Sequence, residues 1–577
     1  MAKVHTTVVP ARQAYPTRFN RLSLVYSTVF TLKLVITPFL AYLTEPFPWT
    51  IPPMIHPAWN ATSKAEASRL TAVYLQSIYN NQTMLPTTVC YRDVTTNSNM
   101  LRLLRPVPPS ASECMQYLMC LPGAGLYTEG MRELVCSFLS ESEQGRARMS
   151  WQHCDHVLMA GLPMGDYCLW FEATGKPTDF MVYHALLIWE DPVLSWCKLV
   201  YRCVLATYIV RVLWRRYYSH YHVLLRNLET LGWANADRGG TAPSFSAFEV
   251  IVGDPTYMVL SDPFVSIAMM TDIWMGLPYL AIATERTSQI TDVWNFVLGC
   301  MYSARYVWAG YLMMWIVSKV VQRHGWERSF QPVEPAHMAM LAYMYGGPLV
   351  LLMNNSALMV PIHALIDLSV HDREGMFDAI PGCIYWTTIM AVVPVVTSTS
   401  WKLWRRCRRV RGTAHDLQAT SLCRRRYCPR LYNDWKSRCV LAVALRRVPR
   451  TVRVEGGRLY SFLEHQPRFR RMPLFSHRGA DSIVLAFVAD RTVARQFRLT
   501  FRGCLALDGS TAVDVEGITA CATAVPATFC TLSSVKCPSC PPTPFEGPHR
   551  LYLHKGANDC QWMLYPDGNA PREVAQE

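Results

Sequence analysis

Six long apolar stretches limit what this chain of 577 residues can fold into. A helix that crosses a membrane needs about 20 mostly apolar residues with few charges. The segments that meet this requirement are 22–43, 193–214, 263–283, 295–317, 338–360 and 383–400. They predict a mostly α-helical, polytopic membrane protein built on a bundle of six transmembrane helices. The second and third segments are the weakest, because each contains charged residues.

The composition agrees with a chain that is partly embedded in lipid. Charged residues make up 17% of the chain and apolar residues 51%, whereas about 25% of an average soluble protein is charged. This composition excludes an intrinsically disordered chain, which combines low hydrophobicity with high charge. The mean hydropathy of +0.08 is close to zero, as expected for an average over apolar spans and polar domains.

The basic residues predict the orientation, because Lys and Arg gather on the cytoplasmic side of membrane helices. Residues 1–21 contain four basic side chains and no acidic one, so we expect a cytoplasmic N-terminus followed by a retained first span. Six crossings would also place the C-terminus in the cytoplasm. The membrane itself would be either the plasma membrane or an endomembrane. The soluble parts expected are an extracytoplasmic domain (44–192), a cytoplasmic loop (215–262), a polybasic juxtamembrane strip (401–449) and a small β-rich cytoplasmic domain (450–577).

The extracytoplasmic domain has the signature of an oxidising compartment. It contains two N-glycosylation sequons, at Asn60 and Asn81. It also contains six cysteines, which predict three disulfides with 15 possible pairings; buried free thiols are the alternative. These cysteines are Cys90, Cys114, Cys120, Cys136, Cys154 and Cys168.

Two histidines of this domain, His153 and His156, are candidates for a metal site. They lie three residues apart and could share one face of a helix. No third ligand at a suitable spacing is evident, so a surface turn beside a disulfide is the favoured interpretation.

Charged residues inside the expected spans are the main functional candidates, because charges at membrane depth are costly and often functional. In one interpretation, four cations and one carboxylate create a positive field for an anionic solute or a lipid headgroup. In the other, Asp272 and Arg305 form an interhelical ion pair while Lys33 and Lys198 reach the headgroups. We favour the structural interpretation, because the sequence has no pore signature or inverted repeat. The residues are Lys33, Lys198, Arg202, Asp272 and Arg305.

The segment after the last expected span carries most of the positive charge. Residues 401–471 contain 20 basic and four acidic residues. Directly beside a membrane, such a run favours anionic lipid over nucleic acid, and Cys407 is a candidate for palmitoylation. The lipid-binding candidates are Arg405, Arg406, Arg408, Arg409 and Arg411.

The tail also contains zinc-type side chains, but a strong zinc signal has two CxxC pairs and this sequence has one. We therefore expect no metal and no cofactor. The weak candidates are Cys537, Cys540, His554 and Cys560.

No phosphate-binding loop, metalloprotease motif or hydrolase nucleophile motif is present. The sequence therefore favours a surface binding protein, receptor-like or scaffolding, whose extracytoplasmic domain binds an unknown protein or ligand. The alternatives are a transporter or channel for an anionic solute, and a membrane enzyme with an unrecognised site. In outline the order of segments is similar to that of polycystin and mucolipin channels. The loop 361–382 is short and acidic, however, and has no glycine-rich filter, so no channel residues are transferred.

Overall fold

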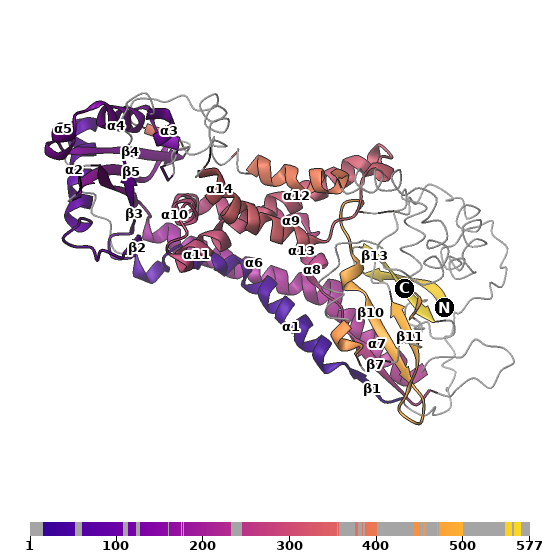
Figure 1. Ribbon diagram of the computed structural model, residues 1–577. Helices are drawn as coiled ribbons and strands as arrows, with labels where there is room; N and C mark the ends of the chain where they lie inside the picture. The colour runs from indigo at the N-terminus through magenta and orange to yellow at the C-terminus, as the bar shows by residue number, and fades with distance from the viewer. Residues whose placement is uncertain are drawn as a thin grey trace, which may run out of the picture.

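Two β-sheets lie at opposite ends of a layer of helices (Figure 1). The computed structural model describes residues 15–51, 61–107, 114–119, 121–122, 127–159, 161–174, 176, 178–231, 245–354, 356, 376–378, 384, 387–400, 442–446, 448, 452, 454–456, 470, 472–499, 549–556 and 559–566.

Two helices match the first two expected spans. α1 (Arg21–Ile36) begins at Asn20, whose side chain accepts a hydrogen bond from a first-turn amide. α6 (Pro192–Leu213) begins in the same way at Asp191, with proline in its first turn, where a missing N–H costs nothing. The two helices pack side by side, and the hydroxyl oxygens of Ser27 in α1 and of Tyr218, just beyond the end of α6, are 2.8 Å apart.

Both helices continue beyond their α-helical parts. The 3₁₀ helix η1 (Thr37–Leu43) extends α1, and the π turn η5 (Trp214–Tyr218) extends α6. The resulting helical stretches, Arg21–Thr50 and Pro192–Tyr218, are long and apolar enough to cross a membrane.

The third expected span, 263–283, is instead two helices. α9 (Pro263–Met275) and α10 (Pro278–Thr287) meet at an angle of 84°. α9 ends at Gly276, and Pro278 begins α10, because proline fits the first turn of a helix but disrupts its interior. Hydropathy averages across this break and does not detect it.

The later expected spans are shorter or interrupted as well. The fourth is α11 (Val293–Ser303), a 3₁₀ turn, η6 (Ala304–Tyr306), and α12 (Val307–Arg323). The fifth, as far as it is described, is α13 (Pro335–Met344), a proline-containing π turn, η8 (Tyr345–Leu349), and α14 (Val350–Asn354). The sixth contains the apolar helix Thr387–Ser400.

The prediction of a bundle of six transmembrane helices is therefore wrong. Within the described ranges, two helices can cross a membrane by length and composition, or three if the bent pair of α9 and α10 counts as one. The physical reason is that Gly, Pro and 3₁₀ turns divide stretches whose average hydropathy is uniform.

All but one strand of the six-stranded sheet come from the expected extracytoplasmic domain. Its order is β2-β3-β6-β5-β4-β8, antiparallel except for the last pair. Its strands are β2 (Cys90–Asp93), β3 (Ser98–Pro106), β4 (Trp151–Met159), β5 (Leu162–Ala173), β6 (Asp179–Ile188) and β8 (Met376–Asp378).

Helices cover both faces of this sheet, because successive side chains of a strand point to opposite faces. Trp170 of β5 packs in one cluster with α2 (Lys64–Ile78). Its neighbour Phe171 packs in another cluster with α4 (Glu129–Ser140). We call this unit, residues 61–188 together with β8, the six-stranded domain.

Two disulfides lie in the six-stranded domain, Cys114–Cys136 and Cys154–Cys168. The second joins paired residues of neighbouring strands β4 and β5. Cys90, for which we expected a disulfide, is a buried free thiol. Cys120 lies outside the described residues.

The five-stranded sheet combines segments from distant parts of the chain, in the order β1-β7-β10-β11-β9. The N-terminal β1 pairs in parallel with β7, and β7 pairs with the tail strand β10. These tail strands thus share a sheet with the N-terminus and the 215–262 loop. The strands are β1 (Thr17–Phe19), β7 (Ala247–Ile251), β10 (Ser482–Phe487), β11 (Val493–Leu499) and β9 (Val454–Gly456).

A separate hairpin is formed by β12 (His549–Gly556) and β13 (Asp559–Pro566). The remaining helices are η2 (Pro48–Thr50), α3 (Cys114–Met119), α5 (Glu143–Arg148), α7 (Ser219–Leu231), α8 (Thr256–Leu260), η7 (Glu327–Ser329) and η10 (Arg478–Ala480).

Candidate functional site

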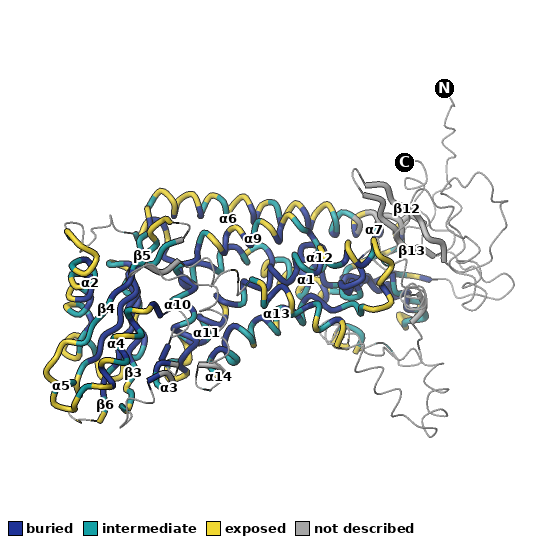
Figure 2. Tube along the Cα trace, turned by 90° about the horizontal axis from the view of Figure 1, so that it is seen from above, coloured by how far each residue is buried: buried dark blue, intermediate teal, exposed yellow. Residues whose placement is uncertain are grey.

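α6 has its polar and apolar faces reversed relative to a helix of a water-soluble protein. Lys198 and Arg202, one turn apart, are buried, whereas Val200 and Val204 on the opposite face are 61% and 64% exposed. Figure 2 shows exposed and buried positions alternating along the whole of α6. The buried face carries the cations of a charge cluster, which we define as Glu45, Glu190, Lys198, Arg202, Asp272 and Arg305.

Arg202 lies at the centre of the charge cluster. Its Nε donates to Asp272 Oδ1 at 2.7 Å, and its Nη2 donates to Glu45 Oε2 at 2.6 Å. The guanidinium also faces the ring of Tyr42, 4.6 Å from its centroid. Arg202 thus joins three elements, since Glu45 follows η1 and Asp272 belongs to α9.

Arg305 completes this end of the cluster from η6. It forms an ion pair with Asp272 and a longer one, 3.5 Å, with Glu45. The Tyr302 hydroxyl donates to Glu45 Oε1 and is also 2.9 Å from the Gly276 carbonyl. A Cβ at Gly276 would overlap Glu45 Oε1 and lie 2.8 Å from the Tyr302 hydroxyl oxygen. The glycine that ends α9 therefore also makes room for these two side chains.

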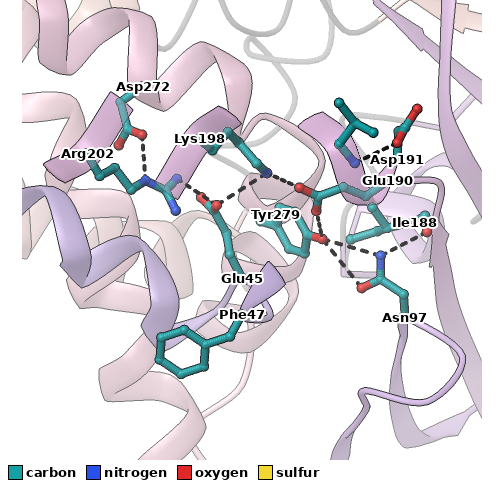
Figure 3. Close-up of polar contacts among 12 residues, drawn as sticks. Glu45, Phe47, Asn97, Ile188, Glu190, Asp191, Lys198, Arg202, Asp272 and Tyr279 are labelled. Atoms are coloured by element: carbon teal, nitrogen blue, oxygen red, sulfur yellow. Dashed lines mark hydrogen bonds and ion pairs between the residues drawn. The ribbon is translucent and has the colours of Figure 1, made fainter. Parts of the chain in front are cut away.

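Lys198 extends the cluster toward the six-stranded domain. It forms an ion pair with Glu190 and a second, at 3.4 Å, with Glu45. The Tyr279 hydroxyl of α10 donates to Glu190. Asn97 Nδ2, in the turn between β2 and β3, lies 3.3 Å from that hydroxyl and 3.0 Å from the Ile188 carbonyl. Figure 3 shows these contacts running without interruption from Asp272 to Asn97.

A second set of buried polar contacts joins α10 to the same domain. Asn99 of β3 donates to Glu285 Oε2 at 2.8 Å. Arg286, the next residue of α10, binds outside that domain, since its Nη1 lies 3.2 Å from the hydroxyl of Thr44 at the end of η1. Glu285 and Arg286 are both less than 5% exposed. α10 therefore attaches the six-stranded domain to the other helices, in addition to the contact of Glu190 with Lys198 of α6.

The charge cluster is electrically balanced, with three cations and three carboxylates. The sequence pattern had predicted four cations against one acid, because it counted only charges inside the expected spans. Glu45 and Glu190 lie just after the first span and just before the second, so including the flanking residues would have found them. Lys33, by contrast, is exposed on α1 and is not part of the cluster.

This arrangement is suited to holding elements together rather than to a reaction. Each carboxylate of the cluster contacts at least one cation of the cluster. Removing one partner of a buried ion pair typically costs about 3–5 kcal/mol, because the other charge is left uncompensated. The described residues of the cluster include no nucleophile paired with a general base.

The histidines considered as metal ligands bind carboxylates instead. His153 Nε2 lies 2.9 Å from Asp155 Oδ1, and His156 Nδ1 pairs with Asp166 Oδ1. This hydrogen bond to Asp166 raises the pKa of His156. Among the described residues, no group of three His, Cys, Asp or Glu side chains is placed to hold a metal ion.

Another histidine, His184, is fully buried, and its Nδ1 lies 3.2 and 3.1 Å from the hydroxyl oxygens of Tyr127 and Tyr167. Burial, reinforced by the nearby charge of Arg105, lowers the pKa of His184 to about 3. We had not singled it out, because a lone histidine in a strand carries no distinctive spacing.

Several other sequence candidates are placed outside the site or lie outside the described residues. Asn81 is exposed, and its side-chain oxygen accepts from the Tyr183 hydroxyl at 2.9 Å. His554 and Cys560 lie on the paired strands β12 and β13. The candidates outside the described residues are Asn60, Arg405, Arg406, Cys407, Arg408, Arg409, Arg411, Cys537 and Cys540.

Comparison with models of protein families, with curated proteins and with solved structures found no match to this chain. The function is therefore argued from the site alone.

Proposed function

We propose that this protein is an integral membrane protein of the binding or receptor-like class, with α1 and α6 crossing the bilayer. The observation that carries the proposal is the reversed α6, which buries Lys198 and Arg202 while exposing Val200 and Val204. In water an extended apolar surface of this kind is rare and costly. Against lipid the same surface is favourable, and the buried charges must then be paired, as they are.

The two sheets support opposite locations for the two ends of the molecule. The six-stranded domain carries both disulfides found in the described residues, and disulfides form and persist in oxidising compartments. The five-stranded sheet joins the N-terminal strand to tail strands beyond the helices. We infer that the six-stranded domain faces the lumen or the cell exterior and the five-stranded sheet faces the cytoplasm.

The charge cluster supports a binding role for the six-stranded domain. Glu190 and Asn97 attach this domain to α6 and α10 through buried contacts, so the domain has a fixed orientation relative to the helices. A domain held in this way presents its outer surface to partners without a flexible linker, which reduces the entropy lost on binding.

Topology is tested with two matched sequons. Asp93 is the last residue of β2 and Asp490 lies in the turn between β10 and β11, and each precedes a threonine by two residues. Asp93→Asn and Asp490→Asn therefore each create an Asn-X-Thr acceptor. In microsomes we expect only Asp93→Asn to add a glycan. Modification of Asp490→Asn, or of both variants, would overturn the proposed orientation.

Binding is tested with the full chain in nanodiscs presented to secreted and cell-surface proteins. Leu85 and Leu162 are 71% and 64% exposed on the six-stranded domain. We expect Leu85→Glu or Leu162→Glu to reduce a specific capture that Asp490→Asn leaves unchanged. A capture that survives both leucine substitutions but depends on the tail would contradict a binding role for this domain.

A transporter is the second candidate function, and one observation favours it. α9 and α10 form a broken helix bent by 84°, beside the buried charges, and discontinuous helices form the binding sites of many transporters. Asp272→Asn and Arg305→Gln in reconstituted vesicles separate the two functions. Altered flux of an anion at normal folding would support transport, whereas changes in stability alone support the binding role.

A further inference from the structure

Four aromatic rings, three of them exposed, form a row where α1 and its 3₁₀ extension meet the beginning of α6. Tyr42 stacks on Phe47 and Phe47 on Trp49, both with ring centroids 4.7 Å apart. Trp49 then contacts Trp196 of α6 at 6.3 Å. We call this row the aromatic ladder. Phe47, Trp49 and Trp196 are 41%, 62% and 48% exposed, which is unusual for large rings in a water-soluble protein.

The ladder is fixed in place by the charge cluster. The ring of Tyr42 stacks on Phe47 on one side and faces the guanidinium of Arg202 as well. Because Arg202 is itself held by Glu45 and Asp272, the first ring of the ladder cannot turn away freely. The exposed rings are therefore an ordered surface on the helices.

A further exposed tryptophan lies at the other end of this helix, on the same face as Trp196, at the first residue of η5. Trp214 is 64% exposed and follows Trp196 by 18 residues. This separation is five helical turns, so both side chains point in the same direction, about 27 Å apart along the helix axis. The hydrocarbon core of a bilayer is about 30 Å thick.

The polarity of the exposed residues along this helix follows the polarity profile of a bilayer, which is apolar in the middle and charged at its surface. Val200, Val204 and Val210 are exposed between them. At the Trp214 end, Arg211 and Arg215 are exposed as well. Tryptophan prefers the membrane interface, where its ring is in the apolar phase and its N–H reaches water, and arginine binds anionic headgroups.

We propose that the aromatic ladder and Trp214 bind the two phospholipid headgroup layers and thereby set the depth of the protein in the bilayer. This inference rests on the membrane crossing of α6 proposed above and adds where the bilayer begins and ends. The ladder marks the layer next to the six-stranded domain, and Trp214 marks the layer next to the five-stranded sheet.

The test uses the full chain labelled with fluorotryptophan in phosphatidylcholine nanodiscs. Fluorine resonances are assigned by Trp196→Phe and Trp214→Phe, and Trp170, fully buried in the six-stranded domain, is the internal control. Nitroxide-labelled lipids carry the spin label either near the headgroup or near the end of the acyl chain. A gadolinium chelate reports exposure to water.

We expect the resonances of Trp196 and Trp214 to lose more intensity with the headgroup-proximal label than with the chain-end label, and Trp170 to respond to neither. Stronger loss with the chain-end label would overturn the proposal while leaving the membrane crossing intact. Protection of Trp196 from every agent, together with a dimer in the nanodisc, would assign the ladder to a second copy and overturn it as well. Loss of both resonances to gadolinium alone would overturn the membrane crossing itself.

Discussion

The ion pair of Lys198 and Glu190 allows a quantitative prediction, because the two residues differ in the contacts that remain when the other is substituted. Both side chains are almost fully buried. In Glu190→Gln, Lys198 still faces Glu45 at 3.4 Å. At an effective dielectric constant of about 20, that remaining attraction is about 5 kcal/mol before the cost of desolvation. In Lys198→Met, by contrast, the Tyr279 hydroxyl is the contact that Glu190 keeps among the described residues.

We therefore expect unequal losses of stability from the two substitutions. Lys198→Met should lower the free energy of unfolding by about 3–5 kcal/mol, the typical result of leaving a buried charge unpaired. Glu190→Gln should cost about 1–3 kcal/mol, the cost of an unsatisfied buried polar group. The double variant should cost less than the sum, because it leaves no uncompensated charge at this contact.

The assay is reversible unfolding of the full chain in mixed micelles with increasing dodecyl sulfate, followed by near-ultraviolet circular dichroism. The three variants and the original protein form a double-mutant cycle. Equal losses for the two single variants, or strictly additive losses in the double variant, would refute the view that the six charged residues act as one network.

Three further predictions concern single residues. Gly276→Ala should destabilise the protein by about 1–3 kcal/mol, because its new methyl group would overlap Glu45; equal stability in the same unfolding assay would show that the helix break has room to adjust. The thermal stability of the six-stranded domain should be highest near pH 6.5, the ordinary histidine pKa. As pH rises through the raised pKa of His156, the protonated form that stabilises the folded state is lost. Below the ordinary histidine pKa, the unfolded chain gains a proton at His184 that the folded, buried side chain does not bind, so the stability falls there as well. His156→Gln should therefore remove the decline on the alkaline side only, as measured by melting temperatures from pH 5 to 8; a decline that persists would assign it to another group. Finally, Cys90 should react with an alkylating reagent only after denaturation, because it is a buried free thiol. A disulfide at Cys90, found by mass spectrometry of the non-reduced protein, would contradict this prediction.

Part of the candidate site could be predicted from local sequence. Asp272 and Arg305 were singled out because charges within apolar stretches are rare, and the structure brings them together as an ion pair. Glu45 and Glu190 were missed, because each lies at the edge of a soluble segment where an acid is ordinary. Only the fold shows that both turn inward and balance the cations of α6.

The expected six-helix architecture was wrong because hydropathy records composition and not continuity. The segment 263–283 is as apolar on average as a true span, but Gly276 and Pro278 divide it into α9 and α10. The break then gives α10 its contact with Asn97 and Asn99 of the six-stranded domain. The sequence contained the Gly and Pro signals, which an average over 20 residues conceals.

By itself, the sequence determined the features that depend on neighbouring residues. These are the two long apolar helices, the capping residues Asn20 and Asp191 that begin them, and the cysteine-rich segment between them. Only the tertiary structure decided which cysteines pair, which acids neutralise Lys198 and Arg202, and that strands from the N-terminus, the middle loop and the tail form one sheet. The physical reason is that helix formation and capping involve groups a few residues apart, whereas ion pairs, disulfides and sheets are selected by proximity in space.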